Sequence, residues 1–598
     1  MVTSGKRGRR DQTGSSSVRA ADRLAVRVAR HGGAWVAVLV IMGVASAVAE
    51  TLLPAVLGHV LDVVLGDDDA ALWLTRCGVL VVLVLACEAL SDLAGEASSA
   101  NATAWLRHTL LRHILALGPR ATRRFAAGDL VSRVVGNASE VGRVAPAAVW
   151  VVTSVIPSVG SLIALALIDP WLCVTFLVGF PVLALLLRAF VRDTSDLATR
   201  YFEAQGAISS RLVDALAGTR TIAAAGTADR EVERVLAPLP ELHKHGQETW
   251  NVHTRMAFQG RLLDWLEVAV LTVGGFEVLW GRITPGELLA ASQYVTLGMG
   301  LGPAVGSLNR LSRARAGAGR AAEVLAEPPM TYGTDFLPPR RGQLEFRDVT
   351  VNLGGERVLD GLDLVVPGGT SVAVVGRSGA GKSLLAALAG RLIDPDEGEV
   401  LLDGVPLTRL KRSELRREVA YGFDRPALIG DTLTEAVGFG QHAPDQEQVE
   451  HAARAACADG FIRRLPQGYQ TRLADAPMSG GEVQRVGLAR AFAHAGRVLV
   501  LDDVTSSLDT VTELQISRVL TGELRGRTHL IVAHRASTAA RADFVAWLDG
   551  HRVRALGPHH ELWNDPDYRA IFTADAEPSE IVGVVSTGNG SRGWGRQE

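Results

Sequence analysis

The sequence has little cysteine, little excess charge and no apolar stretch at its beginning. Its 598 residues include 4 cysteines without paired spacing, so neither a disulfide framework nor a cysteine-based zinc site is indicated. The formal net charge of −3 gives no reason to expect a nucleic-acid partner. The first 22 residues lack the apolar core of a signal peptide, so we interpret residues 1–22 as a disordered basic tail.

Long apolar runs dominate residues 33–310, whereas the sequence after about residue 343 has the mixed composition of a soluble α/β domain. A helix needs roughly 20 mostly apolar residues to cross the bilayer core. A large soluble helical bundle is excluded, because apolar runs of this length and frequency would not stay solvated. The sequence therefore predicts six membrane spans: Trp35–Leu65, Leu72–Leu93, Val144–Leu167, Trp171–Val191, Leu262–Trp280 and Leu288 to about Leu308.

Arginines predict the orientation of these spans. They are concentrated in the first 30 residues and again between residues 107 and 133. By the positive-inside rule both segments lie in the cytoplasm, and the polar helical stretches at about 94–143 and 192–261 project inward. Ionisable groups inside a bilayer are costly. Those in the predicted spans either face a substrate cavity or lie near an interface or a partner chain; they are Glu50, Glu88, Glu267 and Glu277.

A phosphate-binding loop is the most informative motif. It has the pattern G-x-x-x-x-G-K-S, follows the apolar run 370–375, which reads as a buried strand, and precedes a helical pattern over 384–392. In this context backbone N–H groups and a helix N-terminus converge on nucleotide phosphates. The lysine would neutralise the β- and γ-phosphates and the serine would ligate Mg²⁺. The predicted ATP-binding residues are Gly376, Arg377, Ser378, Gly379, Ala380, Gly381, Lys382 and Ser383.

Six spans followed by a phosphate-loop domain resemble a half-transporter of the ATP-binding cassette (ABC) exporter superfamily, over about residues 30–573. The resemblance implies a multi-domain fold, with an all-α six-helix transmembrane domain and an α/β P-loop NTPase domain. The limits we expect are 1–22 for the basic tail, 23–320 for the transmembrane domain, 321–342 for a linker, 343–573 for the ATP-binding domain and 574–598 for a disordered tail.

Further motifs support the resemblance to ABC exporters. Met478–Arg485 is similar to the family signature, whose Ser479, Gly480, Gly481 and Glu482 would open a helix toward a γ-phosphate held by another subunit. Residues 497–503 resemble the Walker B strand, in which Asp502 would hold Mg²⁺. Residues 505–509 resemble the D-loop, and residues 531–535 resemble the switch segment, whose His534 would contact the γ-phosphate.

Three positions depart from the family pattern. Asp503 stands where a glutamate normally polarises the attacking water, and the missing methylene retracts the carboxylate by about 1.5 Å. Asp424 stands where a glutamine normally meets Mg²⁺ and that water, so it is a candidate catalytic residue and metal ligand. Leu353 occupies the place of the aromatic residue that stacks on adenine. The segment before the signature, 471–477, is also shorter than the family's.

In this family two ATP-binding domains enclose two ATP molecules, each between one domain's phosphate loop and the other's signature. A chain with an altered Walker B side and an intact signature resembles the degenerate member of a heterodimer, although a homodimer stays an alternative. Residues 125–133 and 217–222 resemble the family's coupling segments, or are solvated helix hairpins.

The sequence therefore predicts a multi-pass cell-membrane protein with a cytoplasmic N-terminus and a cytoplasmic ATP-binding domain. It would use ATP and Mg²⁺ to export a hydrophobic or amphipathic compound, such as a peptide natural product, a lipid or a drug. Its partners would be a second half-transporter, the lipid bilayer and the substrate. Two alternatives stay open: an importer of a siderophore or a lipid-linked substrate on the same fold, and a membrane-attached regulatory ATPase.

Overall fold

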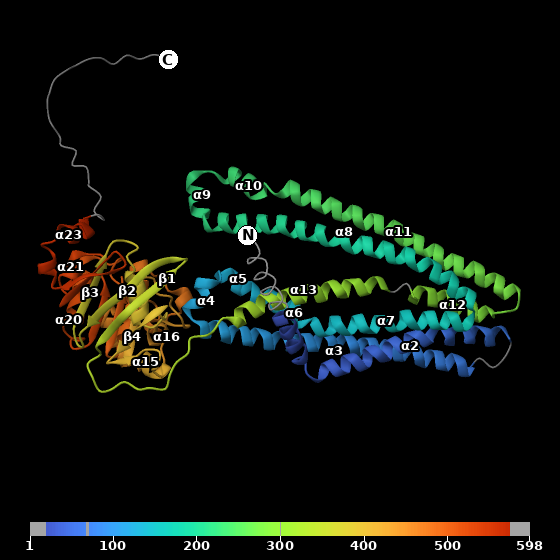
Figure 1. Ribbon diagram of the computed structural model, residues 1–598, viewed down its shortest axis with the longest axis horizontal. Coiled ribbons are helices and arrows are strands. Elements are labelled where there is room, and N and C mark those ends of the chain that lie inside the picture. The colour runs from blue at the N-terminus through green and yellow to red at the C-terminus, as the bar shows by residue number, and fades with distance from the viewer. Residues whose placement is uncertain (1–18, 67–70, 299–300, 574–598) are drawn as a thin grey trace, which may run out of the picture. The chain divides into compact units, whose positions relative to one another are not determined.

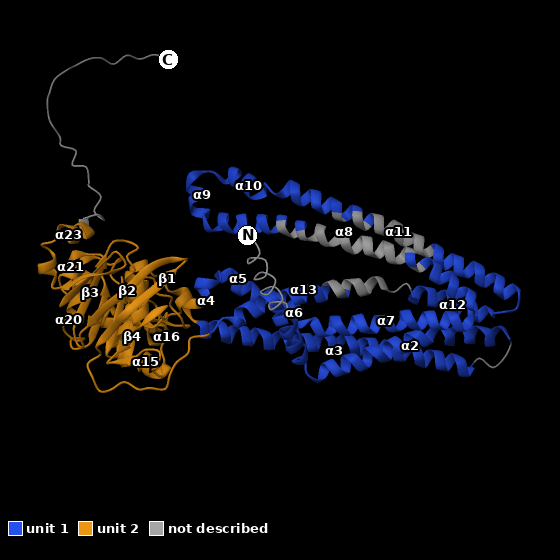
Figure 2. Ribbon diagram, in the orientation of Figure 1, with its two compact units in different colours: residues 1–117, 121–328 blue, residues 118–120, 329–598 orange. Residues whose placement is uncertain are grey.

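The computed structural model describes residues 19–66, 71–298 and 301–573, which divide into two compact units (Figures 1 and 2). The first unit comprises the chain up to residue 117 and residues 121–328; the second comprises residues 118–120 and the chain from residue 329. Residues 19–30 are helical, whereas the rest of the predicted N-terminal tail and the predicted C-terminal tail lie outside the described residues.

The first unit is helical throughout its described part (Figure 1). A five-residue π-helix, Arg133–Asn137, interrupts it between α5 and α6. Its α-helices are α2 (Ala34–Leu65), α3 (Ala71–Leu117), α4 (Pro119–Arg124, whose first two residues belong to the second unit), α5 (Ala127–Ser132), α6 (Ala138–Gly142), α7 (Val144–Ile168), α8 (Pro170–Ala217), α9 (Thr219–Ala225), α10 (Ala228–Leu236), α11 (Leu239–Leu279), α12 (Pro285–Gly298) and α13 (Leu301–Ala326).

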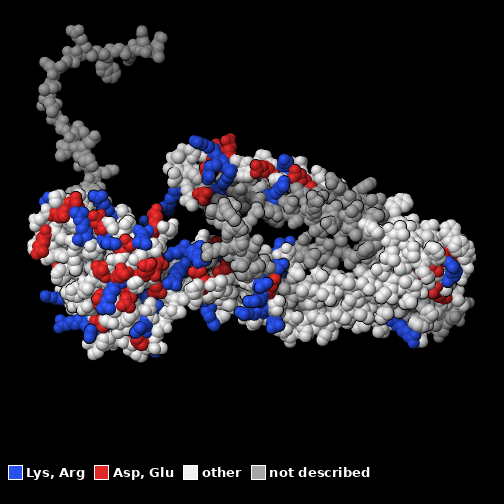
Figure 3. Space-filling view, viewed as in Figure 1, with Lys and Arg blue, Asp and Glu red and all other residues white. Residues whose placement is uncertain are grey.

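Several of these helices have the length and apolar composition of membrane spans. Among the described residues, three segments are long and apolar enough to cross a membrane: Ala34–Leu65, Ala71–Leu117 and Ala127–Ile168. The other three predicted spans fall in α8, α11 and the α12–α13 region. In the view of Figure 3, the surface over α2 and α7 is almost free of charged residues, which gather at the ends of the unit. This uncharged band is the surface that a bilayer requires.

Helices α2 and α12 approach each other closely because both carry glycine at the crossing. A Cβ added to Gly58 would lie 2.4 Å from the carbonyl oxygen of Gly286, so a side chain there would force the helices apart. Small residues at such crossings let helix backbones pack in a membrane. One turn further along, Asp62 accepts hydrogen bonds from the Gly286 N–H (2.7 Å) and the Thr284 hydroxyl (2.6 Å). The start of α12 is thus fastened to the end of α2.

The second unit is an α/β domain with two sheets. A four-stranded antiparallel sheet has the order β2-β1-β4-β5, and a six-stranded sheet has the order β10-β9-β3-β8-β7-β6, in which β9, β3, β8, β7 and β6 run parallel. The strands are β1 (Leu344–Leu353), β2 (Glu356–Val366), β3 (Ser371–Gly376), β4 (Glu397–Leu402), β5 (Val405–Pro406), β6 (Val419–Gly422), β7 (Val498–Asp502), β8 (Thr528–Val532), β9 (Phe544–Asp549) and β10 (Arg552–Gly557).

Helices cover both faces of the six-stranded sheet, which explains the apolar runs 372–375 in β3 and 498–501 in β7. In β7, Val498 and Val500 enter the core beneath α14, whereas Leu499 and Leu501 enter the core beneath α19 and α20. The helices are α14 (Lys382–Ala389), α15 (Arg412–Glu418), α16 (Leu433–Gly438), α17 (Gln446–Ala455), α18 (Asp459–Ile462), α19 (Gly480–Ala493), α20 (Thr510–Thr521), α21 (Ala536–Ala539), α22 (His559–Leu562) and α23 (Pro566–Thr573).

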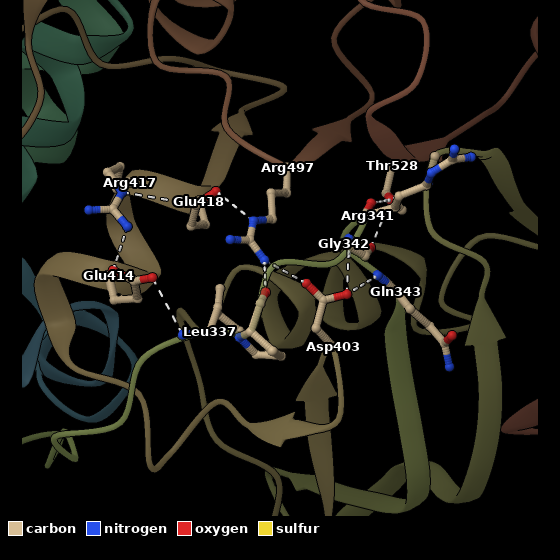
Figure 4. Close-up of polar contacts among 12 residues, drawn as sticks. Leu337, Arg341, Gly342, Gln343, Asp403, Glu414, Arg417, Glu418, Arg497 and Thr528 are labelled. Atoms are coloured by element: carbon tan, nitrogen blue, oxygen red, sulfur yellow. Dashed lines mark hydrogen bonds and ion pairs between the residues drawn. The ribbon is translucent and has the colours of Figure 1, made fainter.

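A buried aspartate fastens the segment that precedes β1 to the rest of this unit (Figure 4). The Asp403 side chain is fully buried; it accepts hydrogen bonds from the N–H groups of Gly342 (3.0 Å) and Gln343 (2.9 Å) and pairs with Arg497 (3.0 Å). The Thr528 hydroxyl donates to the carbonyl oxygen of Gly342 at 2.7 Å. Separating these groups would leave a buried carboxylate without its partners, which is costly, so residues 341–343 form part of the second unit.

Candidate functional site

The phosphate loop leaves the end of β3 and enters α14, as the sequence predicts. Three glycines in the loop have positive φ angles: 157° at Gly376, 84° at Gly379 and 91° at Gly381. Only glycine adopts such angles without strain, and a Cβ at Gly381 would also lie 2.8 Å from the Leu359 side chain. The Lys382 side chain is buried, and its ammonium donates to the carbonyl oxygens of Gly376 (2.8 Å) and Arg377 (3.1 Å). The cation therefore lies within the loop.

Ser383 and Asp502 lie side by side. The Ser383 hydroxyl donates to Asp502 Oδ1 at 2.9 Å, and the Tyr421 hydroxyl donates to Asp502 Oδ2 at 3.1 Å. Burial raises the pKa of Asp502, while these two hydrogen bonds oppose the shift. Burial and the neighbouring carboxylate also raise the pKa of Tyr421, which keeps the phenol protonated and able to donate. Sequence reasoning missed Tyr421, because its contact joins residues 81 positions apart.

Asp503 and His534 face each other across the parallel strands β7 and β8. Asp503 has a φ of 50°, a left-handed conformation that aspartate tolerates better than most residues. Its Oδ2 lies 4.0 Å from Nε2 of His534. Burial raises the pKa of Asp503; His534 opposes the shift and the negative charge of Asp424 adds to it. Asp424 lies 3.8 Å from the exposed Arg425 guanidinium. The structure thus gathers the three predicted catalytic side chains around the end of β7.

The signature forms a helix N-terminus with a capping box. Ser479 is the N-cap of α19; its backbone N–H (2.8 Å) and its hydroxyl (2.9 Å) both donate to the Glu482 carboxylate. These bonds lower the pKa of Glu482 and hold it ionised. An added Cβ at Gly480 would meet no atom within 4 Å, so this side of the helix end is open. Such an end can receive an anion.

Gln484, on the first turns of α19, connects three separate segments of the site, and sequence reasoning gave it no role. Its side chain is buried, and its amide donates to the backbone carbonyl oxygens of Asp503 (3.1 Å) and Asp424 (3.3 Å). Its carbonyl oxygen accepts the N–H of Ser507 at 3.3 Å. The three partners lie 19 to 60 residues away in the chain, so spacing alone could not reveal them. Gln484 fixes the backbone from which the Asp503 and Asp424 carboxylates extend.

Leu353 ends β1 and is followed by a turn through Gly354 and Gly355. Its side chain is 40% exposed, which leaves an apolar surface open for contact. Leucine offers this contact without the π face of an aromatic ring.

The pair of Ser383 and Asp502 fits a magnesium ion that is bound together with nucleotide. Mg²⁺ at phosphate sites takes one or two protein oxygens and completes its shell with water and phosphate oxygens. The described residues contain no cluster of three or more His, Cys, Asp or Glu side chains suited to a metal. Burial is the main cause of the raised pKa of Asp502, and a bound cation would oppose that shift by favouring the ionised carboxylate.

The glutamates in the predicted spans differ in their surroundings. Glu277 is buried and pairs with Arg282 at 3.0 Å, just after α11 ends. Glu50 accepts a hydrogen bond from Ser46 at 2.9 Å. Glu88 lies on an exposed face of α3. For Glu277, the ion pair supports a structural role near the end of a span.

Comparison with known proteins assigns each unit to a known family. Residues 36–301 match the family described as "ABC transporter transmembrane region", and residues 359–506 match the family described as "ABC transporter". The chain is 48% identical over 548 residues to "ABC transporter ATP-binding protein RamA" of Streptomyces coelicolor, covering 91% of this chain and 86% of the relative.

More distant relatives cover most of the chain as well. It is 31% identical to an "ATP-dependent lipid A-core flippase" of Chromohalobacter salexigens, covering 79% of this chain and 84% of the relative. It is 32% identical to a "Fatty acid ABC transporter ATP-binding/permease protein" of Mycobacterium bovis, covering 73% and 70%. The solved structure of a bacterial Atm1-family ABC exporter with ATP bound shares the fold, with a TM-score of 0.74 and 23% identity over 91% of this chain and 98% of that one.

Proposed function

The chain belongs to the ABC transporter family as a half-transporter with one transmembrane region and one ATPase domain, and on this premise we propose that it is the degenerate-site subunit of a heterodimeric exporter. ATP binds at the phosphate loop of residues 376–383, and Ser383 and Asp502 hold Mg²⁺ against its phosphates. Leu353 contacts the adenine. The signature of this chain, opened by Ser479 and Gly480, completes the hydrolytic site on the partner.

The position of the Asp503 carboxylate carries the proposal. General-base catalysis requires the carboxylate to reach the attacking water, and a misplacement of about 1 Å costs on the order of 10²-fold in rate. Gln484 holds the Asp503 carbonyl at 3.1 Å, so the backbone cannot advance to compensate for the shorter side chain. His534 lies 4.0 Å away and would contact the γ-phosphate. This chain's own site therefore retains ATP and turns it over slowly.

The names of the relatives support an amphipathic substrate. A lipid A-core flippase and a fatty acid transporter both handle molecules with an apolar tail and a polar end. An uncharged helical surface suited to a bilayer is consistent with such a cargo (Figure 3). We place the N-terminus and the ATPase domain in the cytoplasm, where the arginines of the polar segments satisfy the positive-inside rule.

Co-expression tests the proposal. The chain is purified alone and together with a half-transporter from the same organism that carries glutamate after its Walker B aspartate, and steady-state ATPase is measured in lipid nanodiscs. We expect robust hydrolysis from the pair and little from the chain alone. A matched pair in which the partner's Walker B glutamate is replaced by glutamine should fall to the level of the single chain. ATPase from the single chain equal to that of the pair would overturn the heterodimer.

A further inference from the structure

A second cavity lies within the ATPase unit, away from the phosphate loop. It has a volume of about 400 Å³ and lies between α20, β8 and the residues that lead into β3. Gly369, Thr370 and Ser371 line it at the beginning of β3, whereas the phosphate loop follows the end of that strand. About 16 Å of strand separates the two places. The volume lies within the range of small-molecule sites.

One half of the cavity wall is apolar. Leu501 and Val504 contribute from β7 and its end, Ile516 and Leu520 from α20, and Ile531 from β8. These side chains also belong to the core beneath α20. The wall would therefore receive an apolar ring or short chain.

One of the lining residues is a buried histidine with an unsatisfied ring nitrogen. His529 lines the cavity and is 3% exposed, and among the described residues its Nε2 has no hydrogen-bond partner. Burial, with a further contribution from Arg527, lowers the pKa of His529 to about 4, so the ring is neutral at physiological pH. A buried polar atom without a partner is costly. A hydroxyl group can satisfy it in either tautomer, because a hydroxyl both donates and accepts.

Three arginines, Arg525, Arg527 and Arg541, line the cavity against two acidic residues and give it an excess of positive charge. Arg527 donates to the backbone carbonyl oxygen of Ala495, whereas within the described ranges neither the Arg525 nor the Arg541 guanidinium pairs with a carboxylate. The two acidic side chains of the lining are already satisfied. Asp543 accepts the N–H (2.8 Å) and the hydroxyl (2.7 Å) of Ser371, and Glu513 pairs with Arg535.

We propose that this cavity is a regulatory site for a small aromatic or short-chain hydroxy acid. The apolar body packs against Ile516 and Ile531, the hydroxyl meets His529, and the acid group meets Arg525 and Arg541. A ligand of this class combines the three features that the wall requires.

The surroundings of the cavity connect it to the hydrolytic machinery. Thr505, in the D-loop, lines it directly. Glu513 lines it as well; this carboxylate accepts the Thr538 hydroxyl at 2.7 Å and pairs with Arg535, the residue next to His534. Thr528, the neighbour of His529, is fixed to Gly342 (Figure 4). Occupancy would therefore favour one position of the D-loop and of the switch histidine, and would change the ATPase rate.

Binding of 5-fluorosalicylate to the full chain with its partner in nanodiscs tests the site. We expect broadening of the ¹⁹F resonance that unlabelled salicylate reverses. Replacing both cations, Arg525→Gln with Arg541→Gln, should weaken binding about tenfold or more. Arg518→Gln, on the exposed side of α20, is the matched control and should leave binding unchanged. Ser517→Phe, which fills the cavity, should abolish binding while labelling by azido-ATP persists.

The same samples test regulation. Saturating 5-fluorosalicylate should change the ATPase rate of the pair and leave the rate of the Ser517→Phe pair unchanged. Absence of broadening, equal weakening by Arg518→Gln, or broadening that persists in Ser517→Phe would overturn the site. An ATPase rate that does not respond to bound ligand would overturn its regulatory role. None of these outcomes depends on whether the transporter is a heterodimer or on its cargo.

Discussion

Lengthening one side chain should restore hydrolysis at this chain's own site. Asp503→Glu keeps the charge and advances the carboxylate by about 1.5 Å. Gln484 holds the backbone at residue 503 in place. The added methylene therefore moves the carboxylate forward, because the end of β7 does not shift back. The left-handed φ of 50° at residue 503 is already present and is unaffected by the length of the side chain.

The expected magnitude follows from that reach. A carboxylate misplaced by about 1 Å costs on the order of 10²-fold, so we expect Asp503→Glu to raise turnover at this site by about 10- to 100-fold, or about 1.4–2.7 kcal/mol of barrier. The increase falls short of a complete rescue because Asp424 still places a negative charge near the attacking water. Asp424→Gln combined with Asp503→Glu should therefore exceed the single variant.

The assay isolates this site by replacing the phosphate-loop lysine of the partner with alanine. Steady-state ATPase of the co-expressed pair then reports the phosphate loop of this chain alone. Asp502→Glu is the matched control, because the same added methylene at a residue held by Ser383 and Tyr421 should lower the rate. If Asp503→Glu leaves the rate unchanged while Asp503→Asn abolishes it, Asp503 is already a competent base and the reasoning is wrong.

Three further predictions concern the partner site, nucleotide retention and stability. In the unmodified pair, Ser479→Ala should reduce ATPase more than Asp503→Asn does, because the signature serves the faster site; near-total loss from Asp503→Asn would contradict this. Lys382→Ala should lower azido-ATP labelling of this chain at sub-saturating nucleotide while partial transport remains, and unchanged labelling would refute its phosphate contact. Asp403→Ala should destabilise the ATPase unit by about 2–4 kcal/mol, because two backbone N–H groups and Arg497 lose a buried partner. Calorimetry of the purified chain measures this loss of stability. A loss no larger than that caused by Asp348→Ala, at an exposed position, would contradict the prediction.

The local parts of the fold could be predicted from the sequence. The strand before the phosphate loop was expected at 370–375 and runs over Ser371–Gly376, because an apolar run followed by a glycine loop and a helix leaves few alternatives. The two-domain architecture was expected from the change in composition, and the family matches confirm it. The long apolar helices were expected as well, because a helix needs roughly 20 mostly apolar residues to cross the bilayer core.

Contacts between distant segments could not be predicted in this way. Tyr421 meets Asp502 only because β6 and β7 are neighbours in the sheet, and Gln484 meets Asp424 and Asp503 only because α19 packs beneath their strands. The cavity beside His529 likewise depends on how α20 lies against β8. No periodicity or spacing encodes such pairs, since they arise from tertiary packing. The roles assigned to the individual site residues remain predictions.

Only a short stretch of chain connects α13, in the helical unit, to the ATPase unit. On one side, the Glu327 carboxylate pairs with Arg124 at 2.9 Å. On the other side, the carbonyl oxygen of Thr331 is held by Arg391 and Gly333 is joined to Leu410. Only Pro328, Pro329 and Met330 lie between, and three residues extend by about 10 Å at most. Two of them are prolines, whose fixed φ angle limits the conformations of this segment. A flexible insertion at residue 329 would lengthen this connection, and it should therefore lower the amount of cargo moved for each ATP hydrolysed.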